Sequence, residues 1–211
     1  MTDDEEYLEA QRKARAAAVD FFRSANKPER ERRVVRAFLT NLGLSFADSE
    51  LVAVQDPPDV RFRDANFEVK EIPDEGRRRH QEYKERLEEA IGATAPTKSV
   101  RTVAYNELAI SKVYDLILQR AKALAAEKYP SEVRRNLDLL FYVNLIHTFE
   151  FVEAPFPDVT ALPALGWRSV SFVKGYRSCV LLATPRAPNF VRNAVGRVVH
   201  RNVQDEAASN L

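Results

Sequence analysis

Residues 57–72 read PPDVRFRDANFEVKEI and contain two short apolar patterns on either side of a polar turn. Val60 and Phe62 alternate with polar residues before the turn, and Phe67 and Val69 alternate with polar residues after it. Alternation with a period of two predicts a β-hairpin with one buried face. Burial of that face predicts that Val60 pairs with Val69 and that Phe62 pairs with Phe67.

The opposite face of this hairpin carries charged side chains. In the expected register, Asp59 lies opposite Lys70 and Arg61 lies opposite Glu68. Carboxylates at diagonal positions on neighbouring strands, about 7–8 Å apart, can share one hard cation such as Mg²⁺. The backbone carbonyl of Val69 lies between Glu68 and Lys70 and can add a neutral ligand. The cation would activate a water molecule for attack on a phosphate ester, and the nearby ammonium of Lys70 would orient that water.

The same residues resemble the signature of the PD-(D/E)XK nuclease superfamily, in which an aspartate precedes a glutamate, one further residue and a lysine. Here Pro58 and Asp59 are followed by eight residues and then by Glu68-Val69-Lys70. The resemblance is closest to uncharacterised bacterial endonucleases of this superfamily. It implies metal-dependent hydrolysis of DNA, with Asp59, Glu68 and Val69 as ligands of Mg²⁺ or Mn²⁺ and Lys70 as the residue that assists the water.

An acidic side chain upstream of the hairpin is a candidate for the same site. KPERERRVVRAFLTNLGL (27–44) predicts an amphipathic helix that ends at Gly43. The apolar stripe of this helix consists of Val34, Val35, Phe38 and Leu42. Glu31 lies three positions before Val34 and four before Val35, so it continues this stripe toward the core. The resemblance implies that Glu31 is an accessory catalytic acid. The alternative is an acid near a helix N-terminus that is favoured only by the helix dipole.

The remaining segments follow one another in an order typical of an α/β protein. Residues 51–55 predict a short strand before the hairpin, and residues 74–91 predict a charged helix after it. Residues 107–129 repeat apolar side chains at helical spacing, and Pro130 follows that pattern. LDLLFYVNLIH (137–147) is a continuous apolar run, which is typical of a central strand covered on both faces.

This order matches the αβββαβ core of the superfamily, so the resemblance implies a restriction-endonuclease-like fold with a mixed central sheet flanked by helices. We expect a single domain over residues 1–211, with the nuclease-like core at 27–147 and a basic appendage at 148–211. Residues 3–24 predict an extra N-terminal helix packed outside the core. The appendage is expected to contain a β-hairpin that turns near Lys174-Gly175, followed by a basic tail.

Basic residues are concentrated in the C-terminal third. Residues 159–204 contain no aspartate or glutamate, whereas the formal net charge of the whole chain is only +1. A second basic run, at 77–79, opens the helix after the hairpin. Such clusters suit the phosphate backbone of DNA or RNA; the alternative is that the arginines pair with acids elsewhere in the fold. The expected nucleic-acid contacts are Arg77, Arg78, Arg79, Lys174, Arg177, Arg192 and Arg197.

Composition narrows the class of protein. With 45% hydrophobic residues, the 211-residue chain can bury a substantial core. No apolar run reaches the roughly 18–20 residues of a membrane span, and the acidic N-terminus lacks the basic start of a signal peptide. One cysteine excludes an internal disulfide framework. We therefore expect a cytoplasmic protein without membrane contact. The apolar stretch 149–167 is a candidate homodimer interface or a loop that covers the core.

A second functional hypothesis retains the fold but not the activity. A salt bridge from Arg61 to Glu68 would occupy a carboxylate that should bind metal. The polar face would then be a structural cluster of ion pairs. The protein would in that case be a catalytically inactive module that binds nucleic acid or a protein partner.

Overall fold

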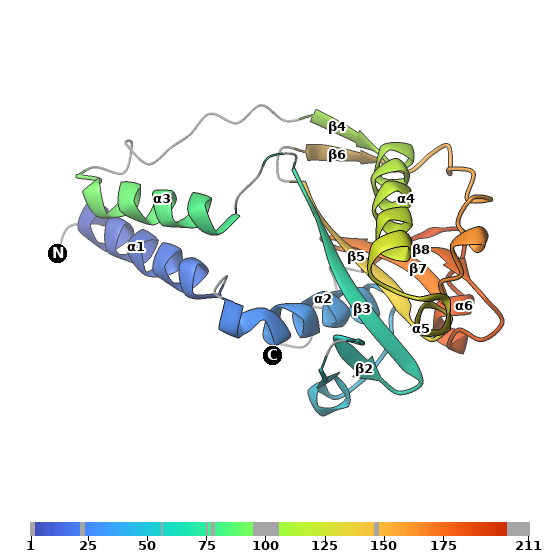
Figure 1. Cartoon of the computed structure of the whole chain (residues 1–211). Helices are drawn as coiled ribbons and strands as arrows, with labels where there is room; N and C mark the ends of the chain where they lie inside the picture. The colour runs from blue at the N-terminus through green and yellow to red at the C-terminus, as the bar shows by residue number, and fades with distance from the viewer. Residues whose placement is uncertain are drawn as a thin grey trace.

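The chain folds around one mixed β-sheet with helices on both faces (Figure 1). The computed structural model describes residues 3–21, 24–55, 57–74, 76, 79–94, 106–145 and 148–201. The strand order is β1-β2-β3-β5-β7-β8-β9. These strands are β1 (Val52–Ala53), β2 (Val60–Phe62), β3 (Ala65–Pro73), β5 (Asp138–Asn144), β7 (Ser169–Lys174), β8 (Arg177–Ala183) and β9 (Val198–His200). The prediction of a mixed central sheet flanked by helices is therefore confirmed.

The centre of the sheet is parallel and both sides are antiparallel. Strands β3, β5 and β7 run parallel to one another. The β1–β2–β3 meander continues the sheet on one side, and β7–β8–β9 continues it on the other. The C-terminal hairpin thus belongs to the same sheet as the predicted nuclease-like core, since β7 pairs directly with β5.

The two faces of the sheet have separate hydrophobic clusters, and alternate residues of β5 contribute to each. Leu139, Phe141 and Val143 pack with α4 (Ile110–Glu127). Leu140 packs with Val35 and Phe38 of α2 (Lys27–Asn41) on the other face. A strand buried on both sides explains the continuous apolar run read from the sequence. Gly43 has a φ of 75°, as expected for the residue that follows the end of α2.

Two further helices lie away from the sheet. α1 (Asp3–Phe21) and α3 (Arg79–Gly92) lie side by side, as Figure 1 shows. The guanidinium of Arg12 donates hydrogen bonds to the carbonyl oxygens of Ala90, at 3.1 Å, and of Ala93, at 3.2 Å. The N-terminal helix therefore packs outside the core, as predicted, and its partner is the helix that follows the hairpin.

Two helices begin later than the sequence predicts. The helix expected from residue 107 begins at Ile110, because residues 106–109 form β4 (Asn106–Ala109), which pairs in parallel with β6 (Thr148–Val152). Strand β3 ends at Pro73, opposite Asn144, and the helix expected from Asp74 begins only at Arg79. The partner of β4 is distant in sequence, so local periodicity carries no sign of that pairing.

The strand expected at 137–147 is β5 (Asp138–Asn144), and the two residues after Leu145 lie outside the described part.

A loop and short helices complete the fold. Within the apolar stretch 149–167, Leu162 and Trp167 are fully buried in the α4 cluster. Short helices are α5 (Ser131–Arg134) and α6 (Asn189–Arg192). None of the helices in the described ranges is long and apolar enough to cross a membrane.

Candidate functional site

The β2–β3 hairpin is tighter than predicted. Its turn consists of Arg63 and Asp64, and Arg63 adopts a positive φ of 51°. Val60 pairs with Phe67, and Phe62 pairs with Ala65, so the predicted register is wrong by two residues. The predicted pairing of Phe62 with Phe67 implied a four-residue turn at 63–66. The turn is shorter because Arg63 takes the left-handed conformation. Because the shift is even, the apolar residues still face the core formed with α2.

The register becomes irregular at Asp59, which brings its side chain across to β3. The backbone N–H of Asp59 donates to the carbonyl of Phe67, at 3.0 Å, although Phe67 already pairs with Val60. Two residues on one strand opposite one residue on the other is the arrangement of a β-bulge. The carboxylate Oδ2 of Asp59 accepts a hydrogen bond from the backbone N–H of Val69, at 2.9 Å. Asp59 is only 2% exposed.

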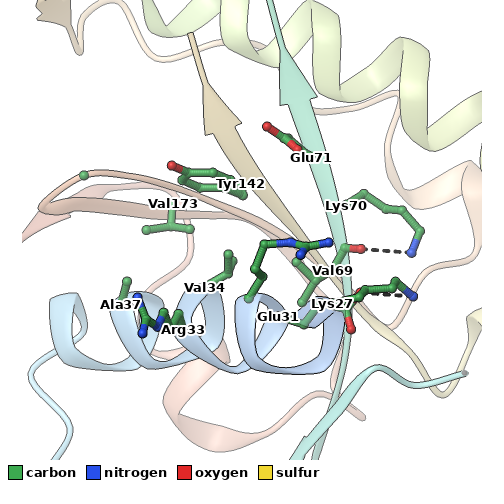
Figure 2. Close-up of a pocket in the computed structure, with 12 residues that line it drawn as sticks. Lys27, Glu31, Arg33, Val34, Ala37, Val69, Lys70, Glu71, Tyr142 and Val173 are labelled. Atoms are coloured by element: carbon green, nitrogen blue, oxygen red, sulfur yellow. Dashed lines mark hydrogen bonds and ion pairs between the residues drawn. The ribbon is translucent and has the colours of Figure 1, made fainter. Parts of the chain in front are cut away.

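Lys70 connects the three predicted metal ligands. Its Nζ donates to the carbonyl oxygen of Val69, at 2.9 Å, and lies 3.5 Å from Oδ2 of Asp59. It also forms an ion pair with Oε1 of Glu68, a side chain with no exposed surface. Figure 2 shows Lys70 beside the Val69 carbonyl. Asp59, Glu68 and Val69 therefore direct oxygen atoms at one positive charge.

Glu31 reaches the same cluster from α2. It is buried, as expected from its place on the apolar stripe. Lys27, one turn earlier on α2, lies between the carboxylates of Glu31 and Asp59. Its Nζ is 3.1 Å from Oε1 of Glu31 and 3.3 Å from Oδ1 of Asp59. The structure thus brings together all four predicted catalytic residues (Asp59, Glu68, Lys70 and Glu31) and adds Lys27, which the sequence analysis did not single out.

Glu68 has two more neighbours that sequence reasoning missed. The hydroxyl of Tyr129 donates a hydrogen bond to Oε1 of Glu68, and Nζ of Lys128 lies 4.0 Å from the same oxygen. Both residues follow the C-terminal end of α4. A tyrosine just before Pro130 has no spacing that relates it to the hairpin, so only the packing of α4 against the sheet reveals this contact.

Burial changes the protonation of both glutamates. It raises the pKa of Glu31 to about 7; the negative charge of Asp59 acts in the same direction, and Lys27 opposes it. The pKa of Glu68 is also raised by burial, against the opposing effects of the Lys70 charge and of hydrogen bonds from Lys70 and Tyr129. Glu31 can therefore exchange a proton near neutral pH, which an exposed glutamate does not do.

A cavity of about 540 Å³ opens beside this cluster (Figure 2). Lys27, Glu31, Val69 and Lys70 line it, whereas Asp59 and Glu68 are buried and are not among the residues that line it. The other lining residues come from α2, β3, β5 and the β7–β8 hairpin. A substrate in this cavity would meet the ammonium groups first.

The donor set partly fits a divalent cation. Oε2 of Glu68 is buried and has no hydrogen-bond partner within the described part of the chain, so this oxygen could still coordinate a cation. Among the described residues, no group of three or more His, Cys, Asp or Glu side chains is arranged to hold a metal ion. Two carboxylates and one carbonyl nevertheless suit Mg²⁺, which commonly keeps several water ligands and takes others from a phosphate substrate.

The predicted nucleic-acid contacts are dispersed. Arg77 and Arg78 lie outside the described residues, and Arg79 begins α3 without a described side chain. Lys174 donates to the carbonyl of Leu145, at 3.1 Å, and burial together with the nearby Arg177 charge lowers its pKa. Arg177 forms an ion pair with Glu153, at 3.1 Å.

The last two predicted contacts lie near the C-terminal end of the described chain. Arg192 and Arg197 are exposed and donate hydrogen bonds to Asn189 and to the carbonyl of Asn193, respectively. None of the described predicted contacts lines the cavity beside the carboxylates.

The hypothesis of an inactive module relied on a salt bridge from Arg61 to Glu68. Arg61 is exposed and pairs with Asn66 across the hairpin, away from Glu68, so the predicted position of Arg61 opposite Glu68 is wrong.

Comparisons with known proteins give one family and one solved structure with a similar fold. A solved structure from Pseudomonas aeruginosa strain PAO1 has a similar fold, with a TM-score of 0.66 and 27% sequence identity over 95% of this chain and 97% of that one. It is described as a protein of unknown function of the monooxygenase superfamily. A comparison with curated proteins found no match. The family model described as "Putative endonuclease, protein of unknown function (DUF1780)" matches residues 3–206, and the chain therefore belongs to this family.

Proposed function

We propose that this protein is a metal-dependent endonuclease that hydrolyses phosphodiester bonds of DNA at the cluster of Asp59, Glu68 and Lys70. One observation carries the proposal: oxygen atoms of Asp59, Glu68 and Val69 converge on the single ammonium of Lys70. Oxygen ligands that already surround a positive charge suit a divalent cation. The family description as an endonuclease supports the same class of reaction.

The fold supports the proposal at the level of topology. Helix α2, the β1–β2–β3 meander, helix α4 and the parallel strand β5 occur in the αβββαβ order of restriction-endonuclease-like nucleases, with α3 and β4 between β3 and α4. The description of the Pseudomonas structure names a different superfamily, and that description applies to that protein. On this chain, the cluster of buried carboxylates and lysines beside a basic cavity favours phosphoryl chemistry.

Each residue of the cluster has a distinct proposed role. Asp59, Glu68 and the Val69 carbonyl would hold Mg²⁺ or Mn²⁺, which would polarise the scissile phosphate and acidify a bound water. Lys70 and Lys27 would move from the carboxylates toward the phosphate oxygens and offset their negative charge. Glu31 would accept a proton from the attacking water, because its pKa of about 7 matches neutral pH. Tyr129 would hold Glu68 in its orientation.

The direct test is cleavage of plasmid, linear, branched and single-stranded DNA, and of RNA, with Mg²⁺, with Mn²⁺ and with chelator. We expect Asp59→Asn and Lys70→Met to lose metal-dependent cleavage by at least about a hundredfold, the scale of one electrostatic contribution to catalysis. Asp64→Asn is the matched control, since Asp64 is an exposed acid in the turn of the same hairpin. Cleavage by Asp59→Asn at the parent rate would refute the site assignment.

A second candidate function is a binding module without turnover, and one observation favours it. Lys27 and Lys70 both contact Asp59, and Lys70 and Tyr129 both bind Glu68. The charges of these two carboxylates are therefore compensated within the protein. A cation must displace these partners in order to bind. Calorimetric titration with Mn²⁺, with and without DNA, separates the two candidates. Binding that Asp59→Asn abolishes supports the endonuclease, whereas no binding at millimolar Mn²⁺ supports the binding module.

A further inference from the structure

A second cavity extends the one beside the carboxylates. It has a volume of about 340 Å³ and reaches the turn between β7 and β8. The two cavities share Arg33, Ala37 and Gly175, so they form one groove that runs along α2, between this helix and the sheet. Figure 2 shows Arg33, Val34 and Ala37 along that helix, with Tyr142 and Val173 across the opening. We call this the α2 groove.

The α2 groove is already formed in the folded chain. The buried side chain of Asn41, at the end of α2, donates hydrogen bonds to the carbonyl of Gly175 and to the hydroxyl of Ser178, both at 3.0 Å. These bonds tie the helix to the β7–β8 hairpin, which forms the opposite wall. A ligand would therefore enter a site whose walls are held in place before it arrives.

The lining of the α2 groove is basic along its rim and apolar at its floor. Among the lining residues that the structure describes, only Glu31 and Glu71 are acidic. The floor includes side chains of Val69, Tyr142 and Val173. The basic lining residues are Lys27, Arg30, Arg33, Arg36, Lys70 and Arg201.

Some of these basic residues have acidic partners on the protein surface. Arg36 pairs with Asp48, at 2.6 Å, and Arg33 pairs with Glu29, at 3.4 Å. The side chain of Asp48 is 63% exposed and that of Glu29 is 41% exposed. Ion pairs that are exposed to water contribute little to stability, so phosphate groups can replace such partners.

An aromatic side chain stands at the far end of the α2 groove. Tyr176 lines the second cavity, and 46% of its surface is exposed. The guanidinium of Arg177 lies 4.2 Å from the centre of its ring, and Glu153 holds that guanidinium in an ion pair. An exposed aromatic ring in a fixed orientation is the element on which proteins stack a base of single-stranded nucleic acid.

We propose that the α2 groove binds one strand of nucleic acid, with phosphates along the basic rim and an unpaired base stacked on Tyr176. This rests on the proposed function, because the strand would bring its scissile phosphate to Lys70 at the other end. Each cavity is the size of a site for a small organic molecule, which suits a few nucleotides of one strand better than a duplex. The recessed position of Asp59 and Glu68 favours the same substrate.

The test measures binding separately from cleavage. Fluorescence anisotropy with labelled single-stranded DNA, single-stranded RNA and a DNA duplex is recorded in chelator, so that no metal-dependent cleavage occurs. We expect Tyr176→Ala to weaken single-strand binding by about 5- to 150-fold and Tyr176→Phe to retain it. Tyr7→Ala is the matched control, because Tyr7 on α1 has a similar exposure of 47% and lies outside the α2 groove. The DNA and RNA arms identify which strand binds more tightly.

Salt dependence tests the rim. Replacing Arg30 and Arg33 together by alanine should lower the slope of log affinity against log salt by about 1.4, at about 0.7 for each phosphate on a single strand. Arg135→Ala is the control, since Arg135 is an exposed arginine outside the α2 groove. Unchanged binding by Tyr176→Ala, an unchanged slope, or tighter binding of the duplex than of the strand would overturn the proposal.

The groove and the proposed reaction can fail independently. If Asp59→Asn binds the strand as tightly as the parent and neither protein cleaves it with any metal, the α2 groove stands and the endonuclease proposal fails. If the parent cleaves with metal and Tyr176→Ala binds and cleaves at the parent level, the endonuclease proposal stands and the groove assignment fails.

Discussion

Replacing Glu31 by glutamine should make the protein more stable at alkaline pH but not at acidic pH. The reason is the raised pKa of this buried carboxyl, about 7 in the folded chain against 4.5 for an ordinary glutamate. Between these pH values the folded state keeps a proton that the unfolded state releases. The stability associated with this proton is therefore complete below about pH 4.5 and is lost as the pH rises through about 7.

The magnitude follows from the two pKa values. Each pH unit between them corresponds to about 1.4 kcal/mol, so ionised Glu31 destabilises the folded state by up to about 3 kcal/mol above pH 7. Glutamine cannot ionise and avoids this loss, although it also gives up the ion pair with Lys27, which lies 3.1 Å from Glu31. We therefore expect Glu31→Gln to be about 1–3 kcal/mol more stable than the parent at pH 8.5 and nearly equal to it at pH 5.

The assay is reversible denaturant unfolding at several pH values between 5 and 8.5, with chelator present so that no metal binds near Asp59. Glu29→Gln is the matched control, because Glu29 lies on the same helix, has a side chain that is 41% exposed and pairs with Arg32 and Arg33 at the surface. Its effect should stay within about 1 kcal/mol across the range. A difference between parent and Glu31→Gln that does not grow with pH would refute the reasoning.

Three other substitutions test contacts seen in the fold. Tyr129→Phe removes the hydroxyl that donates to Glu68; it should destabilise the protein by about 1–3 kcal/mol and reduce metal-dependent cleavage. Asp138→Ala leaves the charge of Arg168 unpaired in the interior and should cost about 3–5 kcal/mol in denaturant unfolding. Phe38→Ala empties a fully buried position between α2 and the sheet and should cost about 3–5 kcal/mol, lowering the melting temperature. Stability equal to the parent in any of these variants would contradict the contact concerned.

The hairpin shows how far local patterns reach. Alternation of Val60, Phe62, Phe67 and Val69 with polar residues predicted two strands and their buried face, and all four side chains lie in one hydrophobic cluster. The pairing was wrong by two residues, because the pattern does not report the turn conformation. The conformation of Arg63, with its φ of 51°, makes the turn shorter than the polar residues suggested.

By itself, the sequence determined the hairpin, helix α2 and strand β5, and the inward faces of these elements. The periodicity of α2 placed Glu31 on the inward face, and the apolar run of β5 predicted a strand covered on both sides. Only the tertiary structure brought Lys27 and Tyr129 to the carboxylates and joined Tyr176 to the α2 groove. Lys27 lies on α2, Tyr129 follows α4 and Tyr176 lies in the turn between β7 and β8. The contact of Lys27 with Asp59, that of Tyr129 with Glu68 and the place of Tyr176 in the α2 groove therefore depend on packing between elements, which no local spacing encodes.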